Sequence, residues 1–215
     1  MLVVRSRSLA ISRILCVGAH SDDIEIGCGG TILKLLGEHP GTEVDWVVLS
    51  ATGAREEEAR QSADRFLAGA GSRRITIRDF RERYFPYDPA VKEFFDELGG
   101  TVTPDLVLAP HRHDAHQDHR TTAELVSNTF RDQLVLEYEI PKTDGDLGKP
   151  GIYVHLDRGI VDSKVQILCE TFATQRDRAW FSDDTFRGLM RLRGIEARAP
   201  QGFAEAFHAR TLVLA

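Results

Sequence analysis

Apolar, strand-like segments alternate with helix-like segments through the first two-thirds of this 215-residue chain. This alternation constrains the fold more than any other feature, because strands joined by helices of this length form βαβ units around a parallel sheet. The right-handed crossover rule then favours an α/β fold: a doubly wound, Rossmann-like, mostly parallel sheet with helices on both faces. We expect strands at residues 14–19, 44–51, 74–80, 106–109 and 134–140, and helices at 31–38, 55–67, 88–98 and 116–130.

The pattern changes after Ile140. Residues 141–151 are rich in Gly, Asp, Lys and Pro, which predicts a loop over the edge or mouth of the sheet. Further helices are expected at 159–172 and 184–193, and a last strand at 210–214. We therefore expect one domain over residues 1–215, with a Rossmann-like core at about 13–140 and a C-terminal α/β elaboration at 141–215.

The composition of the chain indicates which binding partners and which cellular compartment to expect. The net charge is −6 and Lys and Arg are scattered, so we expect no nucleic-acid partner. The three cysteines show no Cys-x-x-Cys spacing, which argues against a cysteine-bound metal and suits a reducing cytoplasm. No apolar run approaches the roughly 20 residues that span a bilayer, and no signal peptide is visible. We expect a cytoplasmic protein without an integral membrane segment; its oligomeric state stays open, with a homo-oligomer among the alternatives.

Two clusters of histidine and acidic residues directly follow predicted strands. The first runs from His20 to Asp23 after strand one, and the second from His111 to His119 after strand four. Strands one and four are neighbours at the switch point of the common order 3-2-1-4-5, which would place both loops at one crevice. Imidazole and carboxylate groups suit zinc, and a catalytic zinc typically keeps three protein ligands and a water.

The residue types in the two clusters suggest a division of roles. His20 and Asp23 can supply two metal ligands from one turn, and a histidine of the second cluster can supply the third. Asp22 lies beside a ligand without being needed as one, so it is the candidate general base for a water. His116 and His119 are three residues apart, and on a helix one could ligate while the other faces a developing oxyanion.

Residues 27–30, Gly-Cys-Gly-Gly, are expected to form a glycine-rich turn ahead of the first helix. They lack the dinucleotide-binding and Walker spacings, so close packing of helix on strand explains them better than a phosphate loop does. The missing fingerprint also weighs against a non-catalytic Rossmann-like ligand-binding protein, which remains the alternative from a different functional class.

Residues 19–31 resemble the first motif of the PIG-L/LmbE-like zinc N-deacetylases (GlcNAc-PI de-N-acetylase-like), Ala-His-Pro-Asp-Asp-x-Glu-x-Gly-Cys-Gly-Gly-Thr. They depart from it only at Ser21, where the family usually has Pro. The second family motif, Asp-x-His-x-Asp-His, is matched at residues 114–119. Together with Thr52, Gly53, Arg55 and Glu58 after the second strand, and Pro104-Asp105 before the fourth, the resemblance covers roughly residues 13–130.

This resemblance implies that His20, Asp23 and His119 bind zinc, with Fe2+ as the alternative metal in the cell. It implies that Asp22 activates water and later protonates the leaving amine. The implied activity is removal of an N-acetyl group from an N-acetylglucosamine-type or related conjugate.

The resemblance also implies roles for residues around the metal. His116 would stabilise the oxyanion of the tetrahedral intermediate, and Asp118 would orient His116. Arg55 resembles the family's substrate-contacting arginine; the alternative is an exposed residue at the start of a helix, paired with Glu58 or Glu57. Within catalysis, the alternative is a deacetylase or amidase for a non-sugar natural product or thiol conjugate. The pocket wall, expected from residues 84–89 and 139–149, would decide between them.

Overall fold

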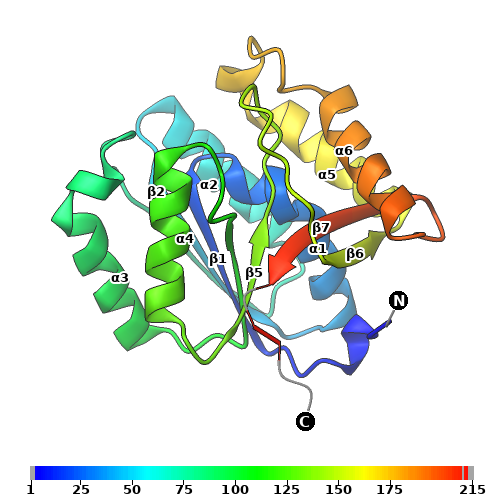
Figure 1. The fold of residues 1–215 in the computed structure, drawn as a ribbon, viewed down its shortest axis with the longest axis horizontal. Coiled ribbons are helices and arrows are strands. Elements are labelled where there is room, and N and C mark those ends of the chain that lie inside the picture. The colour runs from blue at the N-terminus through cyan, green and yellow to red at the C-terminus, as the bar shows by residue number, and fades with distance from the viewer. Residues whose placement is uncertain (1–2, 210, 213–215) are drawn as a thin grey trace.

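The computed structural model describes residues 3–209 and 211–212. A seven-stranded sheet in the order β3-β2-β1-β4-β5-β7-β6 forms its centre (Figure 1). The strands are β1 (Arg13–His20), β2 (Glu43–Ser50), β3 (Ser72–Ile77), β4 (Leu106–Pro110), β5 (Leu134–Tyr138), β6 (Ile152–Leu156) and β7 (Phe203–Ala209). The helices are α1 (Asp23–Glu38), α2 (Ala54–Phe66), α3 (Pro89–Thr101), α4 (Gln117–Thr129), α5 (Arg158–Thr171) and α6 (Asp183–Glu196). Three short 3-10 helices are η1 (Ser6–Ser8), η2 (Phe85–Tyr87) and η3 (Ala173–Gln175).

The first five strands are parallel and stand in the expected order 3-2-1-4-5. β7 then runs antiparallel to both β5 and β6. The expected doubly wound α/β fold is therefore confirmed. Strand order reverses between β1 and β4, so the loops after these two strands meet at the carboxyl edge of the sheet.

Alternate residues of the central strands face two separate hydrophobic cores. Cys16 of β1 joins the core that α1, α2, α5 and α6 cover, whereas Leu15 and Val17 join the core that α3 and α4 cover. Figure 1 shows α3 and α4 together on one side and α5 and α6 on the other. A strand buried on both faces is a continuous apolar run, which explains why the apolar residues of β1 do not alternate with polar ones.

The glycine-rich residues 27–30 lie inside α1, so the expectation of a turn followed by a helix from Thr31 was wrong. A Cβ at Gly27 would lie 2.1 Å from Tyr138, and a Cβ at Gly29 would lie 2.6 Å from Phe66. Glycine weakens an isolated helix by about 1 kcal/mol relative to alanine. Here the close packing of α1 on its neighbours outweighs that cost. Close packing is the reason that the sequence suggested for these glycines.

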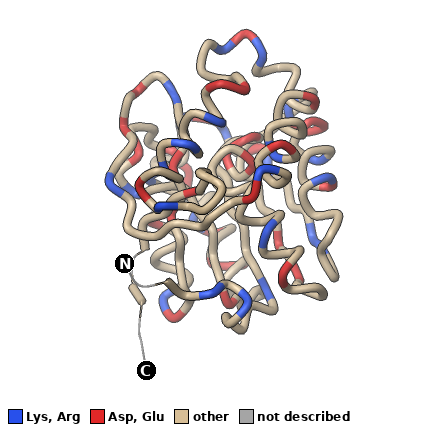
Figure 2. Tube along the Cα trace, turned by 90° about the vertical axis from the view of Figure 1, so that its right-hand side faces the viewer, with Lys and Arg blue, Asp and Glu red and all other residues tan. Residues whose placement is uncertain are grey.

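The C-terminal segment differs from expectation in its strands. The last strand is β7 at Phe203–Ala209; of the expected strand at 210–214, Thr211 and Leu212 are not in a strand and the rest lies outside the described residues. β6 at Ile152–Leu156 was not anticipated, because it is only half-buried and follows a loop. In the part of the chain that is described, every helix is too short or too polar to cross a membrane. Figure 2 shows basic and acidic residues interspersed along the trace.

Candidate metal centre and active site

Two loops that are distant in sequence meet at the switch point of the sheet. β1 ends at His20 and α1 begins at Asp23, so the first cluster occupies the tight connection between them. β4 ends at Pro110, and α4 begins one residue after His116, its N-cap. His20 and His119 are separated by 99 positions, yet His20 Nδ1 lies 3.1 Å from His119 Nε2.

The side chains of His20, Asp23 and His119 converge on one point. Asp23 Oδ2 lies 3.5 Å from His20 Nδ1 and 3.3 Å from His119 Nε2. With metal bonds of about 2.0–2.1 Å, ligand atoms lie about 3.3 Å apart in a tetrahedral site and about 2.9 Å apart at the right angles of an octahedral one. The three observed separations fit one face of a tetrahedron, so this donor set fits a zinc-like ion.

His116 brings a third imidazole to this cluster. A ring nitrogen of His116 lies within 4.8 Å of ring nitrogens of His20 and His119, so the three histidines also form a possible metal-binding group. The ring of His116 meets that of His20 edge-on, with centroids 4.8 Å apart. Its Nδ1 accepts a hydrogen bond from the backbone N–H of Asp118, at 3.3 Å. In the neutral ring the proton therefore resides on Nε2, which makes His116 a hydrogen-bond donor.

Carboxylates face the other ring nitrogens of His20 and His119. His119 Nδ1 lies 2.9 Å from Asp114 Oδ2, and His20 Nε2 lies 3.4 Å from Asp118 Oδ2. Such partners fix the orientation of a metal-binding ring and raise its basicity. Asp114 is a site residue to which the sequence analysis gave no role, although its place in the second motif was a signal for it.

Asp118 contacts His116 through its backbone N–H and His20 through its carboxylate. Its carboxylate lies at His20 rather than at His116, and it also accepts hydrogen bonds from the backbone N–H groups of Arg83 and Phe85. Arg83 has a φ of 68°, in the left-handed region that side chains rarely adopt. The carboxylate of Asp118 therefore contacts both His20 and the strained loop at Arg83.

The electrostatics of the cluster favour a cation at its centre. Burial disfavours charged imidazoles, but Asp23 and Asp118 raise the pKa of His20 to about 9. Likewise, against the effect of burial, Asp23 and Asp114 raise the pKa of His119 to about 10. Burial favours the neutral acid at Asp23, yet His119 and His20 hold its pKa well below the ordinary value. A divalent ion at this point would be stabilised by the same carboxylates.

Asp22 combines burial with an uncommitted carboxylate. It is the N-cap of α1, a position from which aspartate usually accepts a bond from the first turn, but its side chain makes no such bond. Among the described residues, Oδ2 has no hydrogen-bond partner. Burial and the neighbouring Asp23 raise the pKa of Asp22 to about 6, while the charge of Arg55 lowers it. Such a carboxylate is suited to exchange protons near neutral pH.

Arg55 lies beside this turn. Its Nε donates to Ser21 Oγ at 3.2 Å, and its Nη1 donates to Glu82 Oε2 at 3.2 Å. It therefore pairs with neither Glu57 nor Glu58 in the described contacts, and its charge acts on Asp22. The structure brings Arg55 to the site, as the resemblance implies.

A cavity of about 300 Å³ opens beside His116. Its lining residues are Arg83, Ala115, His116, Gln117, Arg120 and Asp144. Asp144 belongs to the loop at 141–151, which therefore reaches the rim of the cavity. In the same loop Lys142 donates to Asp114 at 2.8 Å and to Asp146 at 2.6 Å. The loop is thus joined through Asp114 to His119.

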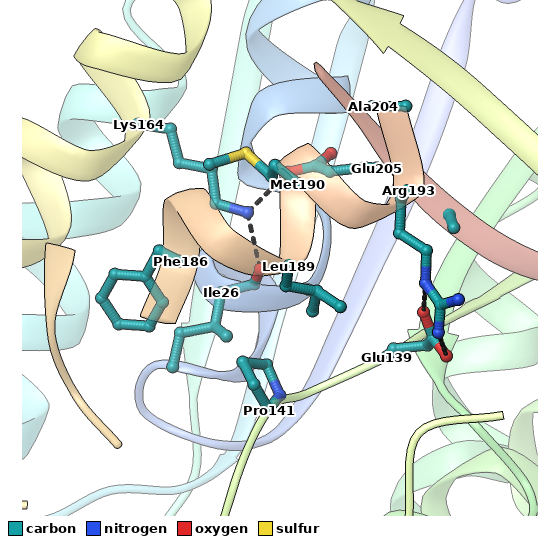
Figure 3. A pocket seen from close by; sticks show the side chains of 12 residues that line it. Ile26, Glu139, Pro141, Lys164, Phe186, Leu189, Met190, Arg193, Ala204 and Glu205 are labelled. Carbon is teal, nitrogen blue, oxygen red and sulfur yellow. Dashed lines mark hydrogen bonds and ion pairs between the residues drawn. The ribbon is translucent and has the colours of Figure 1, made fainter. Parts of the chain in front are cut away.

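A second, enclosed cavity lies away from the metal cluster. It measures about 20 Å³, room for one water, and is bounded by two buried ion pairs, Lys164–Glu205 and Arg193–Glu139 (Figure 3). Lys164 Nζ also donates to the backbone oxygen of Ile26 in α1. This cavity is too small for a substrate. The Lys164–Glu205 pair instead connects α5 and β7 to α1, and the Arg193–Glu139 pair connects α6 to the segment after β5.

The chain is thus an α/β protein with a mostly parallel sheet, whose switch point holds a group of histidines and carboxylates that could bind a metal ion. Residues 15–130 match the family model PIG-L: GlcNAc-PI de-N-acetylase, and the chain belongs to this family.

Among characterised relatives, the diacetylchitobiose deacetylase of Thermococcus kodakarensis is 29% identical over 128 residues, which cover 51% of this chain and 46% of the relative. The matched part thus spans about half the length of that relative.

Solved structures share the fold. The N,N'-diacetylchitobiose deacetylase from Pyrococcus horikoshii has a TM-score of 0.73 at 21% identity, covering 93% of this chain and 84% of the other. The 4-carboxy-2-hydroxymuconate hydratase from Pseudomonas putida KT2440 has a TM-score of 0.74 at 17% identity, covering 95% and 98%. At these identities the likeness establishes the fold alone.

Proposed function

We propose that the chain is a zinc-dependent N-deacetylase that hydrolyses the acetamido group of an N-acetylglucosamine-type conjugate. The observation that carries the proposal is the convergence of His20, Asp23 and His119 on one point, with the uncommitted carboxylate of Asp22 next to it. Family membership supports the same activity. Two imidazoles and a carboxylate suit zinc, and Fe2+ is the alternative metal.

When bound, the metal ion would supply Lewis acidity, which polarises the amide carbonyl and makes a water easier to deprotonate. Asp22 accepts the proton of the attacking water and returns it to the amide nitrogen, so that acetate and a free amine leave. His116 Nε2–H donates a hydrogen bond to the oxyanion that develops on the carbonyl oxygen. Asp114 and Asp118 hold the rings of His119 and His20 in place.

The decisive test is acetate release by chain loaded with zinc or with Fe2+, measured on N,N'-diacetylchitobiose, other N-acetylglucosamine conjugates and non-sugar acetamides. Asp22→Asn should retain the metal and lose roughly 10²–10⁴-fold in kcat, since the amide cannot accept the proton. Near-native turnover by this variant at full metal occupancy would exclude Asp22 as the base. Activity confined to non-sugar amides would favour the alternative substrate class. Because a hydratase shares this fold, metal binding alone would not establish the reaction, and the release of acetate has to be measured.

A further inference from the structure

Ser21 is the one residue of the first motif at which this chain departs from the family pattern. Its side chain lies between His20 and Asp22 in the turn after β1 and is completely buried. The hydroxyl oxygen accepts a hydrogen bond from Arg55 Nε at 3.2 Å. Proline at this position could make no such bond, so the departure introduces a polar contact inside the site.

The ion pair of Arg55 with Glu82 restrains the guanidinium less than the bond to Ser21 does. The Arg55 side chain is 32% exposed and that of Glu82 is 40% exposed, so solvent screens the ion pair between them. Glu82 also lies 3.9 Å from the Arg83 guanidinium and is shared between the two arginines. The buried hydroxyl of Ser21 is therefore the contact that fixes where the Arg55 guanidinium lies relative to Asp22.

We propose that Ser21 is a positioning residue, whose hydroxyl holds the Arg55 guanidinium beside Asp22 so that Arg55 contacts the acetamido substrate. The inference rests on the proposed function, because it assigns the substrate contact to an N-acetylated sugar. Because the Arg55 guanidinium is partly exposed, the free energy of its hydrogen bond to Ser21 lies at the low end of the range for bonds to charged groups. That free energy corresponds to about a tenfold change in an equilibrium constant.

Kinetics of zinc-loaded variants test the functional part. Ser21→Ala should raise KM for N,N'-diacetylchitobiose about tenfold, change kcat less than about twofold and leave zinc affinity unaltered. Ser21→Pro removes the same hydroxyl but stiffens the turn, and it should show the same KM. Ser21→Thr keeps a hydroxyl and should recover the wild-type KM. An unchanged KM in Ser21→Ala would overturn the proposal, because the hydroxyl would then have no role in substrate binding. A joint loss of kcat and zinc affinity would also overturn it, because the geometry of the turn would then be what matters.

A measurement without substrate tests the contact itself. In a 15N-edited NMR spectrum the Arg55 Nε–H signal is assigned as the one missing from Arg55→Lys. Ser21→Ala should shift this signal and speed its hydrogen exchange, and Ser21→Thr should leave it close to its wild-type position. A signal indifferent to Ser21→Ala refutes the positioning role whatever the activity. If the wild type releases no acetate from any sugar but the signal depends on Ser21, the proposed function falls and the contact stands.

Discussion

Replacing Lys164 with Met tests how the C-terminal segment supports α1, the helix that begins with Asp23. Lys164 and Glu205 are 2% and 3% exposed and form an ion pair of 2.6 Å. Glu205 also accepts the backbone N–H groups of Gly30 and Thr31, at 2.8 and 2.6 Å, halfway along α1. Without the lysine, this carboxylate stays buried with two backbone donors but no counter-charge.

The expected loss is about 3–5 kcal/mol in the free energy of unfolding, the usual cost of removing one partner of a buried ion pair. This is a large part of the roughly 5–15 kcal/mol by which a domain is stable. With a urea m-value of about 2 kcal/mol per M, Lys164→Met should lower the urea midpoint by about 2 M. The assay is equilibrium urea unfolding followed by Trp fluorescence, since Trp46 is fully buried. EDTA is included, because metal bound to the native state would add stability of its own.

Lys92→Met is the matched control. Lys92 pairs with Asp96 on the surface of α3, with the side chains 50% and 64% exposed. An exposed pair of this kind contributes at most about 1 kcal/mol. If Lys164→Met costs no more than Lys92→Met does, the buried pair does not hold α1, and the reasoning about the C-terminal segment is refuted.

Three further perturbations concern the metal, acid stability and the cavity. His119→Ala should lose most of its zinc on dialysis, as metal analysis would show; retained zinc would remove His119 from the ligand set. Although burial opposes it, His111 and Arg112 lower the pKa of Glu137 to about 2. Its carboxylate should therefore contribute about 3 kcal/mol above the unfolded pKa of about 4.5, and lose it as pH falls toward 2. The difference in unfolding free energy between wild type and Glu137→Gln should shrink from pH 6 to pH 3, and a constant difference contradicts this. Asp144→Ala should change KM and preference among acetamido sugars without changing zinc affinity; identical kinetics on every sugar would make the 141–151 loop a mere connector.

The positions of the candidate site could largely be predicted because the signals are local. His20, Asp22 and Asp23 follow a buried apolar strand, and a short turn keeps neighbouring residues together in any fold. The strand order 3-2-1-4-5, the common one for such sheets, then brings the loop ending at His119 alongside.

The second layer of contacts could not be predicted, because each depends on a partner from a distant segment. Nothing local indicates that Asp118 faces His20 rather than His116, since its direction depends on how α4 docks against β1. The bond from Lys142 to Asp114 likewise exists only because the 141–151 loop folds back over the site.

Sequence alone determined the class of fold, the two motifs and the residue types able to bind a metal, because periodicity, turn formation and ligand chemistry are properties of short segments. Tertiary structure decided that residues 27–30 lie within a helix and that β7 lies between β5 and β6, antiparallel to both. It also decided that Ser21 meets Arg55. The physical reason is the same in each case: packing and hydrogen bonding between remote segments outweigh local preferences of about 1 kcal/mol per residue.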